Sequence, residues 1–139
     1  SLDDIKAKSA AFNQEKIAGR RMPTAVVRDA KLEAIFKESF GQECKAKNWD
    51  TKVLKINIVD RDWTIVKNKI TGVILGRKRY AAIGLKDNKK GICKLVDFHI
   101  YQEYNGSGYN AYAKGTSTES IEILCKDISV CQEKPDGHK

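Results

Sequence analysis

The residues whose types and spacing could support acid–base chemistry lie in the segment KLVDFHIYQEYNGSGY, residues 94–109. From Asp97 onward every second residue is titratable, namely Asp97, His99, Tyr101 and Glu103. Alternate residues of a β-strand point to the same side of its sheet. A strand here would therefore place these groups in one row, in which Asp97, His99 and Tyr101 are the candidates for general acid–base catalysis.

The other row of the same segment is apolar and contains Val96, Phe98 and Ile100. We expect this apolar row to face the core and the titratable row to face solvent, as is usual for an antiparallel sheet. A catalytic acid or base needs a pocket that excludes water. The sequence therefore favours an ordinary solvated strand face, although a one-residue shift of register would turn the titratable row inward.

The elements that must position these rows begin with helices, which we predict over residues 3–47. Residues 3–18 form a weak amphipathic pattern, and a clearer helix follows Asp29, a suitable N-cap, and extends to about Lys47. Its apolar positions have helical spacing. These positions are Leu32, Ile35, Phe36 and Phe40.

After Trp49 the periodicity changes from helical to alternating, which predicts strands. The expected extended segments are 53–59, 63–66, 70–86, 92–104, 109–114 and 121–128, with a bulge or loop over 115–120. The predicted fold class is α+β, with N-terminal helices packed on a curved four- to five-stranded antiparallel sheet over 53–128. We expect one domain over residues 1–131 and a mobile tail over 132–139.

The four cysteines are Cys44, Cys93, Cys125 and Cys131. No C-x2-C pair is present and the chain has only two histidines, so we expect no metal site. Two disulfides and four reduced thiols both remain open, and we favour disulfides, which would indicate an oxidising compartment. The preferred pair is Cys93–Cys125, and Cys44–Cys131 would then be the second.

The chain is basic, with 26 Lys and Arg against 18 Asp and Glu and a net charge of +8. Such a charge is typical either of an ordinary soluble basic protein or of one that contacts an anionic partner. Nucleic acid is disfavoured because the aromatic strand motifs and zinc knuckles of RNA-binding domains are missing. No apolar run approaches the ~18–20 residues of a membrane span. The candidate contact surface comprises Arg77, Lys78, Arg79, Lys86, Lys89 and Lys90.

The order of a helix followed by antiparallel strands over residues 29–128 resembles the cystatin-like and NTF2-like α+β folds. The stretch DWTIVKNKITGVILGR (62–77), with GIC (91–93) and QEYNGSGY (102–109) after it, also resembles small secreted bacterial proteins of uncharacterised function. The Q-x-V-x-G hairpin and the later Pro-Trp pair of cystatin protease inhibitors do not occur in this sequence. We therefore do not expect inhibition of cysteine proteases.

The leading hypothesis is a non-enzymatic, extracytoplasmic bacterial domain with a cystatin-like fold that binds an anionic ligand or a protein partner and needs no cofactor. The alternative is an NTF2-like protein with a small-molecule pocket, in which Asp97, His99 and Tyr101 could be catalytic. A third hypothesis is an intracellular nucleic-acid-binding protein, which would lose affinity steeply with salt.

Overall fold

The helix predicted after Asp29 is the main helix of the computed structural model, which describes residues 14–128. Helix α2 spans Ala30–Lys47. The Asp29 carboxylate accepts hydrogen bonds from the amides of Lys31 and Leu32, as an N-cap should. Asn48 ends the helix in the left-handed conformation. Both predicted ends of this helix are therefore confirmed.

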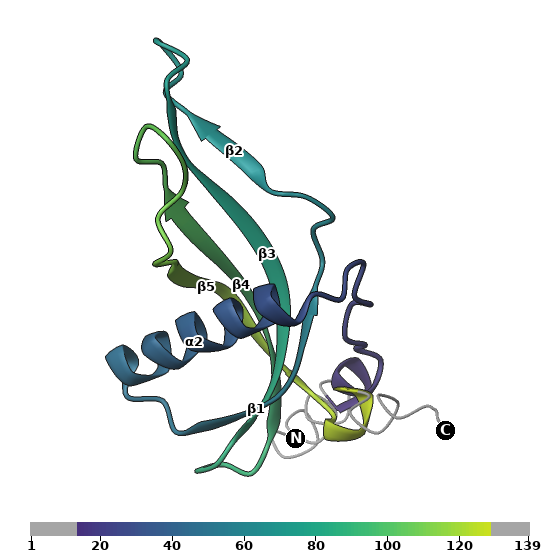
Figure 1. The fold of residues 1–139 in the computed structure, drawn as a ribbon. Helices are drawn as coiled ribbons and strands as arrows, with labels where there is room; N and C mark the ends of the chain where they lie inside the picture. Colours follow the sequence, from purple (N-terminus) through teal and green to yellow (C-terminus); the bar gives the residue numbers. More distant parts are fainter. Residues whose placement is uncertain (1–13, 129–139) are drawn as a thin grey trace, which may run out of the picture.

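The strands form one antiparallel five-stranded sheet with the order β1-β3-β4-β5, in which β2 pairs with β3. Helix α2 crosses one face of this sheet, which confirms the α+β class (Figure 1). A short 3-10 helix, η1, follows the last strand. The bounds are β1 Thr51–Ile58, β2 Thr64–Lys67, β3 Ile74–Asp87, β4 Cys93–Glu103, β5 Lys114–Ile123 and η1 Cys125–Ile128.

Strands β1 and β2 lie along the same edge of β3, because β4 occupies its other edge. Residues 59–63 interrupt this edge. The Arg79 guanidinium donates hydrogen bonds to the backbone carbonyls of Asp60 and Arg61, and the Asp60 carboxylate accepts one from the Tyr80 amide. Residues 59–63 are therefore held in place by hydrogen bonds, and Trp63 at their end leads into β2.

The main core lies between α2 and the sheet. Phe40 packs edge-on against Phe98, with their ring centroids 5.2 Å apart, and Phe36 is fully buried beside them. Val96 and Ile100 are buried in the same cluster. The apolar row of β4 therefore faces the helix, as its alternation predicts.

A second, smaller core lies on the opposite face of the sheet, beside η1. It contains Cys93, Leu95, Ile123 and Ile128, and Met22 from the segment before α2 packs against it. The sheet is therefore covered on both faces at this end. This end contains the disulfide, and we call it the proximal end.

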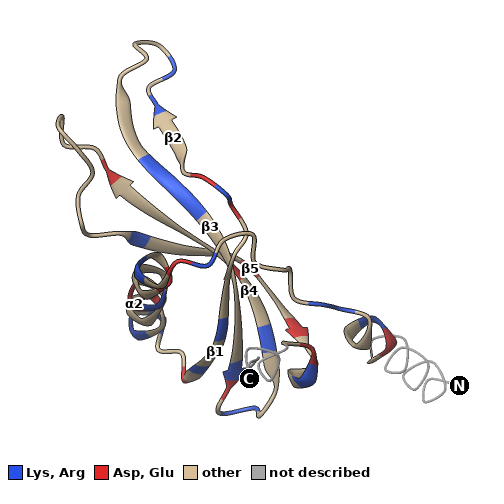
Figure 2. Cartoon of the chain, turned by 45° about the vertical axis from the view of Figure 1, so that its right-hand side comes forward, with Lys and Arg blue, Asp and Glu red and all other residues tan. Residues whose placement is uncertain are grey.

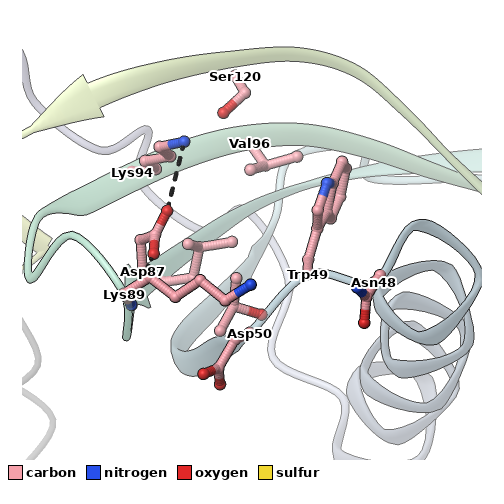
Figure 3. A pocket seen from close by; sticks show the side chains of 10 residues that line it. Asn48, Trp49, Asp50, Asp87, Lys89, Lys94, Val96 and Ser120 are labelled. Atoms are coloured by element: carbon pink, nitrogen blue, oxygen red, sulfur yellow. Dashed lines mark hydrogen bonds and ion pairs between the residues drawn. The ribbon is translucent and has the colours of Figure 1, made fainter.

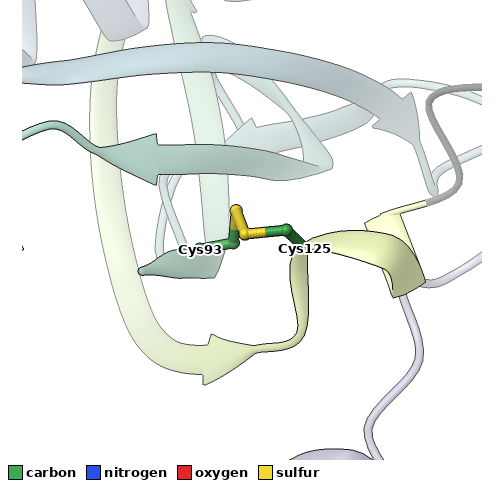
Figure 4. Close-up of a disulfide and its surroundings, with 2 residues drawn as sticks. All are labelled: Cys93 and Cys125. Carbon is green, nitrogen blue, oxygen red and sulfur yellow. A yellow bond between two sulfur atoms is a disulfide. The ribbon is translucent and has the colours of Figure 1, made fainter. Parts of the chain in front are cut away.

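The Cys93–Cys125 disulfide predicted from the sequence is confirmed, and it joins the first residue of β4 to the first residue of η1 (Figure 4). Cys44 is a free thiol whose Sγ lies 3.3 Å from Thr51 Oγ1. The structure therefore does not contain the second predicted pair, Cys44–Cys131, and Cys131 lies outside the described residues.

Strand β3 begins at Ile74, although the sequence predicts a strand from Ile70. The Asn68 side chain accepts hydrogen bonds from the amides of Ile70 and Thr71, and its carbonyl accepts one from Gly72. Gly72 has a φ of 75°, a conformation that favours glycine. A tight turn is therefore more stable here than an extended strand, despite the β-branched residues.

Strand β5 is continuous from Lys114 to Ile123, although the sequence predicts a break over 115–120. The irregularity is a single shift of register opposite Asp97 and Phe98. Residues 125–128, predicted as the end of a strand, form η1. The predicted tail over 132–139 lies outside the described residues.

Candidate binding surfaces

The titratable row of β4 lies on the face of the sheet opposite α2. Asp97 is exposed, and the His99 ring packs against Tyr80 with centroids 4.9 Å apart. The Tyr101 ring lies directly over Gly76, where a β-carbon would collide with it. Within residues 14–128, no hydrogen bond joins the side chains of Asp97, His99 and Tyr101.

The His99 imidazole is the half-buried member of this row. Burial, with a smaller contribution from the Lys78 ammonium, lowers the pKa of His99 from its ordinary value of 6.5. Its Nδ1 atom is buried and has no hydrogen-bond partner among the described residues. This environment favours the neutral ring.

The six basic residues predicted as one contact surface do not lie together. Arg79 is only 7% exposed, and its guanidinium bonds the backbone of residues 59–63. Lys78 lies on the opposite face, with its Nζ 5.8 Å from the Tyr80 ring. The others in the prediction, Lys86, Lys89 and Lys90, are exposed at the far end of β3 and in the β3–β4 turn.

Arg77, also from that prediction, lies between two aromatic rings. Its guanidinium carbon is 4.0 Å from the Trp63 centroid and 4.2 Å from the Tyr109 centroid. Its Nε donates a 2.9 Å hydrogen bond to Gln102 Oε1. Cation–π contacts of this kind are stabilising when the cation is partly desolvated. This stack joins three segments of the chain, namely residues 59–63 before β2, strand β3 and the connection between β4 and β5.

Above the stack lies the distal end of the molecule, formed by the β2–β3 turn (68–73) and the β4–β5 connection (104–113). The Tyr104 amide donates a 2.9 Å hydrogen bond to the Leu75 carbonyl, so the two segments are joined. Figure 1 shows the β2–β3 turn projecting well beyond α2. The exposed large apolar residues of this end are Ile70, Val73 and Tyr112, and Ile65 in β2 and Leu75 in β3 are exposed beside it.

The β2–β3 turn holds its two aliphatic residues outward in an ordered conformation. Ile70 is 95% exposed and Val73 is 58% exposed. The Val73 carbonyl accepts a 2.8 Å hydrogen bond from the Asn68 amide, and the Val73 amide donates to Thr71 Oγ1. These bonds fix the backbone at the apex, so the exposure of Ile70 is a property of a defined turn.

The paired part of the hairpin that carries this turn, β2 with residues 74–78 of β3, contains no acidic residue. No Asp or Glu occurs from Trp63 to Lys86, whereas Lys67 and Lys69 directly precede Ile70. Figure 2 shows basic residues at the end of β2 and in the turn after it, and no acidic residue on the turn or on β2. The acidic residue paired with it on β4 is Glu103, which lies opposite Gly76. The apex is therefore apolar with a positive border.

A pocket of about 330 Å³ lies on the helix side of the sheet, next to the end of α2 (Figure 3). Leu85 and Val96 line it from the sheet and the Trp49 indole lines it from the helix side. Lys94 Nζ lies 3.8 Å from Asp87 Oδ2 at its polar end. Amide hydrogen bonds from Lys90 and Lys89, together with the nearby lysine ammonium groups, lower the pKa of Asp87.

The sequence analysis did not identify this pocket or the distal end. The pocket residues come from segments that carry no common motif. The sequence does not reveal the apex of the β2–β3 turn, because Ile70 and Val73 fit the pattern of a strand. The part of the chain that the structure describes contains no helix long and apolar enough to cross a membrane.

Comparison with protein-family models, with curated proteins and with solved structures finds no match to this chain.

Proposed function

We propose that this chain is a non-enzymatic binding module with a cystatin-like fold that works in an extracytoplasmic compartment of a bacterium. The Cys93–Cys125 disulfide supports the compartment, because such bonds persist where the surroundings are oxidising. The arrangement of a helix across an antiparallel sheet supports the fold. The binding surface in this proposal is the distal end.

The observation that carries the proposal is the outward display of Ile70 and Val73 on an ordered turn. Exposed aliphatic side chains that gather at one place are characteristic of interaction sites. A backbone already fixed by hydrogen bonds loses little conformational entropy when it binds. The stack of Arg77 between Trp63 and Tyr109 packs the segments below this turn against one another.

Site-specific photo-crosslinking tests the proposal. A photoreactive phenylalanine analogue replaces Ile70 in one variant and Lys90 in a matched variant, since both positions are exposed in turns at opposite ends of the sheet. We expect adducts at position 70 and few at position 90 in the cells that produce the protein. Equal labelling at the two positions, or no adduct at position 70, would contradict a distal binding surface.

A second candidate function, binding of a small molecule, is favoured by the pocket beside Trp49. Its apolar floor and charged end suit a small amphipathic compound. Titration with small aromatic acids and amines, followed by NMR, should shift the Trp49 indole and the Ser120 amide together. A Trp49→Ala variant should abolish the shift of the Ser120 amide, and an absence of saturable shifts in the unsubstituted chain would reject this candidate.

A further inference from the structure

We propose that the apex of the β2–β3 turn docks on an anionic lipid surface. Ile70 and Val73 enter the boundary between headgroups and acyl chains, and Lys67 and Lys69 meet the headgroup phosphates. This inference rests on the proposed function, because it names the partner of the distal end.

The position of the apolar residues fits insertion into a lipid surface. Ile70, 95% exposed, lies at the apex of the turn, and Val73 lies on the side that returns into β3. The turn projects beyond the rest of the sheet and beyond α2, so it can reach a planar surface before other elements do (Figure 1). Asn68 accepts hydrogen bonds from the backbone amides of Ile70, Thr71 and Gly72 within the turn, which lowers the cost of removing these amides from water.

The charges around the apex match an anionic surface. Lys67 and Lys69 are exposed and have no ion-pair partner among the described residues. The paired part of their hairpin contains no acidic residue that would repel headgroup phosphates. Basic residues near an anionic membrane surface contribute attraction that adds up along the segment.

The β4–β5 connection, which returns below the apex to the start of β5 opposite Tyr101, carries side chains of the same kinds. Tyr112 is 63% exposed, and Lys114 is exposed two residues later. Tyrosine is enriched at membrane interfaces, where its ring lies among the headgroups and its hydroxyl stays hydrated. No Asp or Glu occurs from Tyr104 to Thr118. The two adjoining segments therefore carry the same combination of apolar and basic side chains.

A lipid surface fits the apex better than a second copy of the chain. A stable protein interface buries about 800 Å² on each partner. The aliphatic part of this apex consists of Ile70 and Val73 on a projecting turn, with positive charge at its border. Two copies brought together at their apices would oppose lysine to lysine, whereas phosphates would be attracted.

Co-sedimentation with lipid vesicles tests the inference. The probe vesicles contain phosphatidylglycerol and phosphatidylcholine, and the comparison vesicles contain phosphatidylcholine alone. We expect the full chain to sediment with the anionic vesicles only, and the bound fraction to fall as salt is raised well above ~0.1 M because the attraction is screened. Ile70→Ser combined with Val73→Ser should lower the partition coefficient about tenfold or more.

A matched pair of charge variants tests whether the attraction to anionic vesicles comes from the distal end. Lys67→Gln with Lys69→Gln removes the charges beside the apex, and Lys89→Gln with Lys90→Gln removes the same charge at the proximal end. We expect about a tenfold loss of partitioning for the first variant and less than about a twofold loss for the second. Thermal unfolding should be unchanged in all variants, because the substituted side chains are exposed.

Equal losses for the two charge variants, or equal binding to both kinds of vesicle, would overturn the inference. An absence of vesicle binding would also overturn it. In that last case, protein adducts at position 70 would leave the proposed binding module standing, whereas an absence of such adducts would remove both proposals. Concentration-dependent dimers that Ile70→Ser abolishes, seen without vesicle binding, would replace the lipid by a second copy.

Discussion

Arg79 and Lys78 are neighbours in the sequence, but their side chains lie on opposite faces of β3. Arg79 donates three hydrogen bonds, of 3.1, 3.0 and 2.6 Å, to backbone carbonyls of residues 60 and 61. Lys78 makes a long contact with the Tyr80 ring and acts on the His99 imidazole through its charge. A cluster of basic residues in a strand is therefore divided by the alternation of the strand itself.

This difference predicts unequal effects on stability. Arg79→Met should lower the free energy of unfolding by about 2–4 kcal/mol, because it removes three hydrogen bonds that a buried guanidinium donates to the carbonyls of Asp60 and Arg61. Lys78→Met should change it by less than about 1 kcal/mol. Urea denaturation of the two variants measures both free energies. Similar losses of stability in the two variants would show that Arg79 does not stabilise residues 59–63.

His99 predicts a pH dependence of stability. Its pKa is lower in the folded chain than the ordinary value of 6.5, so the unfolded chain binds more protons as the pH falls below 6.5. Stability should therefore decrease from about pH 6.5 downward through the folded pKa, and the contribution of His99 should be constant above that range.

Chemical denaturation between pH 5 and pH 7.5 measures this slope, and His99→Gln should reduce it. Lys78→Met should raise the pKa of His99 in an NMR titration, because it removes a neighbouring positive charge. His138→Gln is the control for the other histidine in the chain. An unchanged slope in His99→Gln would refute this account.

At the scale of elements, the contact between α2 and β5 depends on a glycine. A β-carbon at Gly115 would collide with the Phe98 ring and the Ser39 hydroxyl. Ser39 is buried in α2 and donates a 3.0 Å hydrogen bond to the Ala113 carbonyl. The close approach of the helix to the edge strand is therefore possible only without a side chain at this position.

Two glycine-to-alanine substitutions should have opposite effects. Gly115→Ala should destabilise the fold by about 1–3 kcal/mol through overpacking. Gly41→Ala, on the exposed side of α2 where a β-carbon meets nothing within 4 Å, should stabilise it by about 0.5–1 kcal/mol. Thermal and urea unfolding provide the comparison, and a stabilising Gly115→Ala would disprove the packing of α2 against β5.

At the scale of the whole molecule, the covalent bond and the exposed apex lie at opposite ends of the sheet. The Cys93–Cys125 disulfide fastens the proximal end, where both faces of the sheet are covered. The apex at the distal end projects without a covering element (Figure 1). Stability and the proposed binding are therefore concentrated in different parts of the domain.

Thiol labelling under denaturing conditions tests the cysteine states. Cys44 should be alkylated without prior reduction, whereas Cys93 and Cys125 should react only after reduction. Protection of Cys44 until reduction would instead support the Cys44–Cys131 pair predicted from the sequence. Because the disulfide spans 32 residues, its reduction should lower the free energy of unfolding by about 3–4 kcal/mol, and Cys44→Ser should not.

Features that depend on neighbours along the chain can be predicted from the sequence alone. The cap at Asp29 and the helical spacing of Leu32, Phe36 and Phe40 defined α2. The alternation around Phe98 established which row of β4 faces the core. These features are predictable because capping and periodicity are set within a few residues.

Contacts between residues that are distant in the sequence depend on the packing of the whole domain. Trp63, Arg77 and Tyr109 form a stack because the register of three segments brings them together. The exposure of Ile70 depends on a turn that Asn68 stabilises and that the β-branched pattern conceals. Register and packing are properties of the whole sheet, and for that reason no local pattern could place the distal end or the pocket.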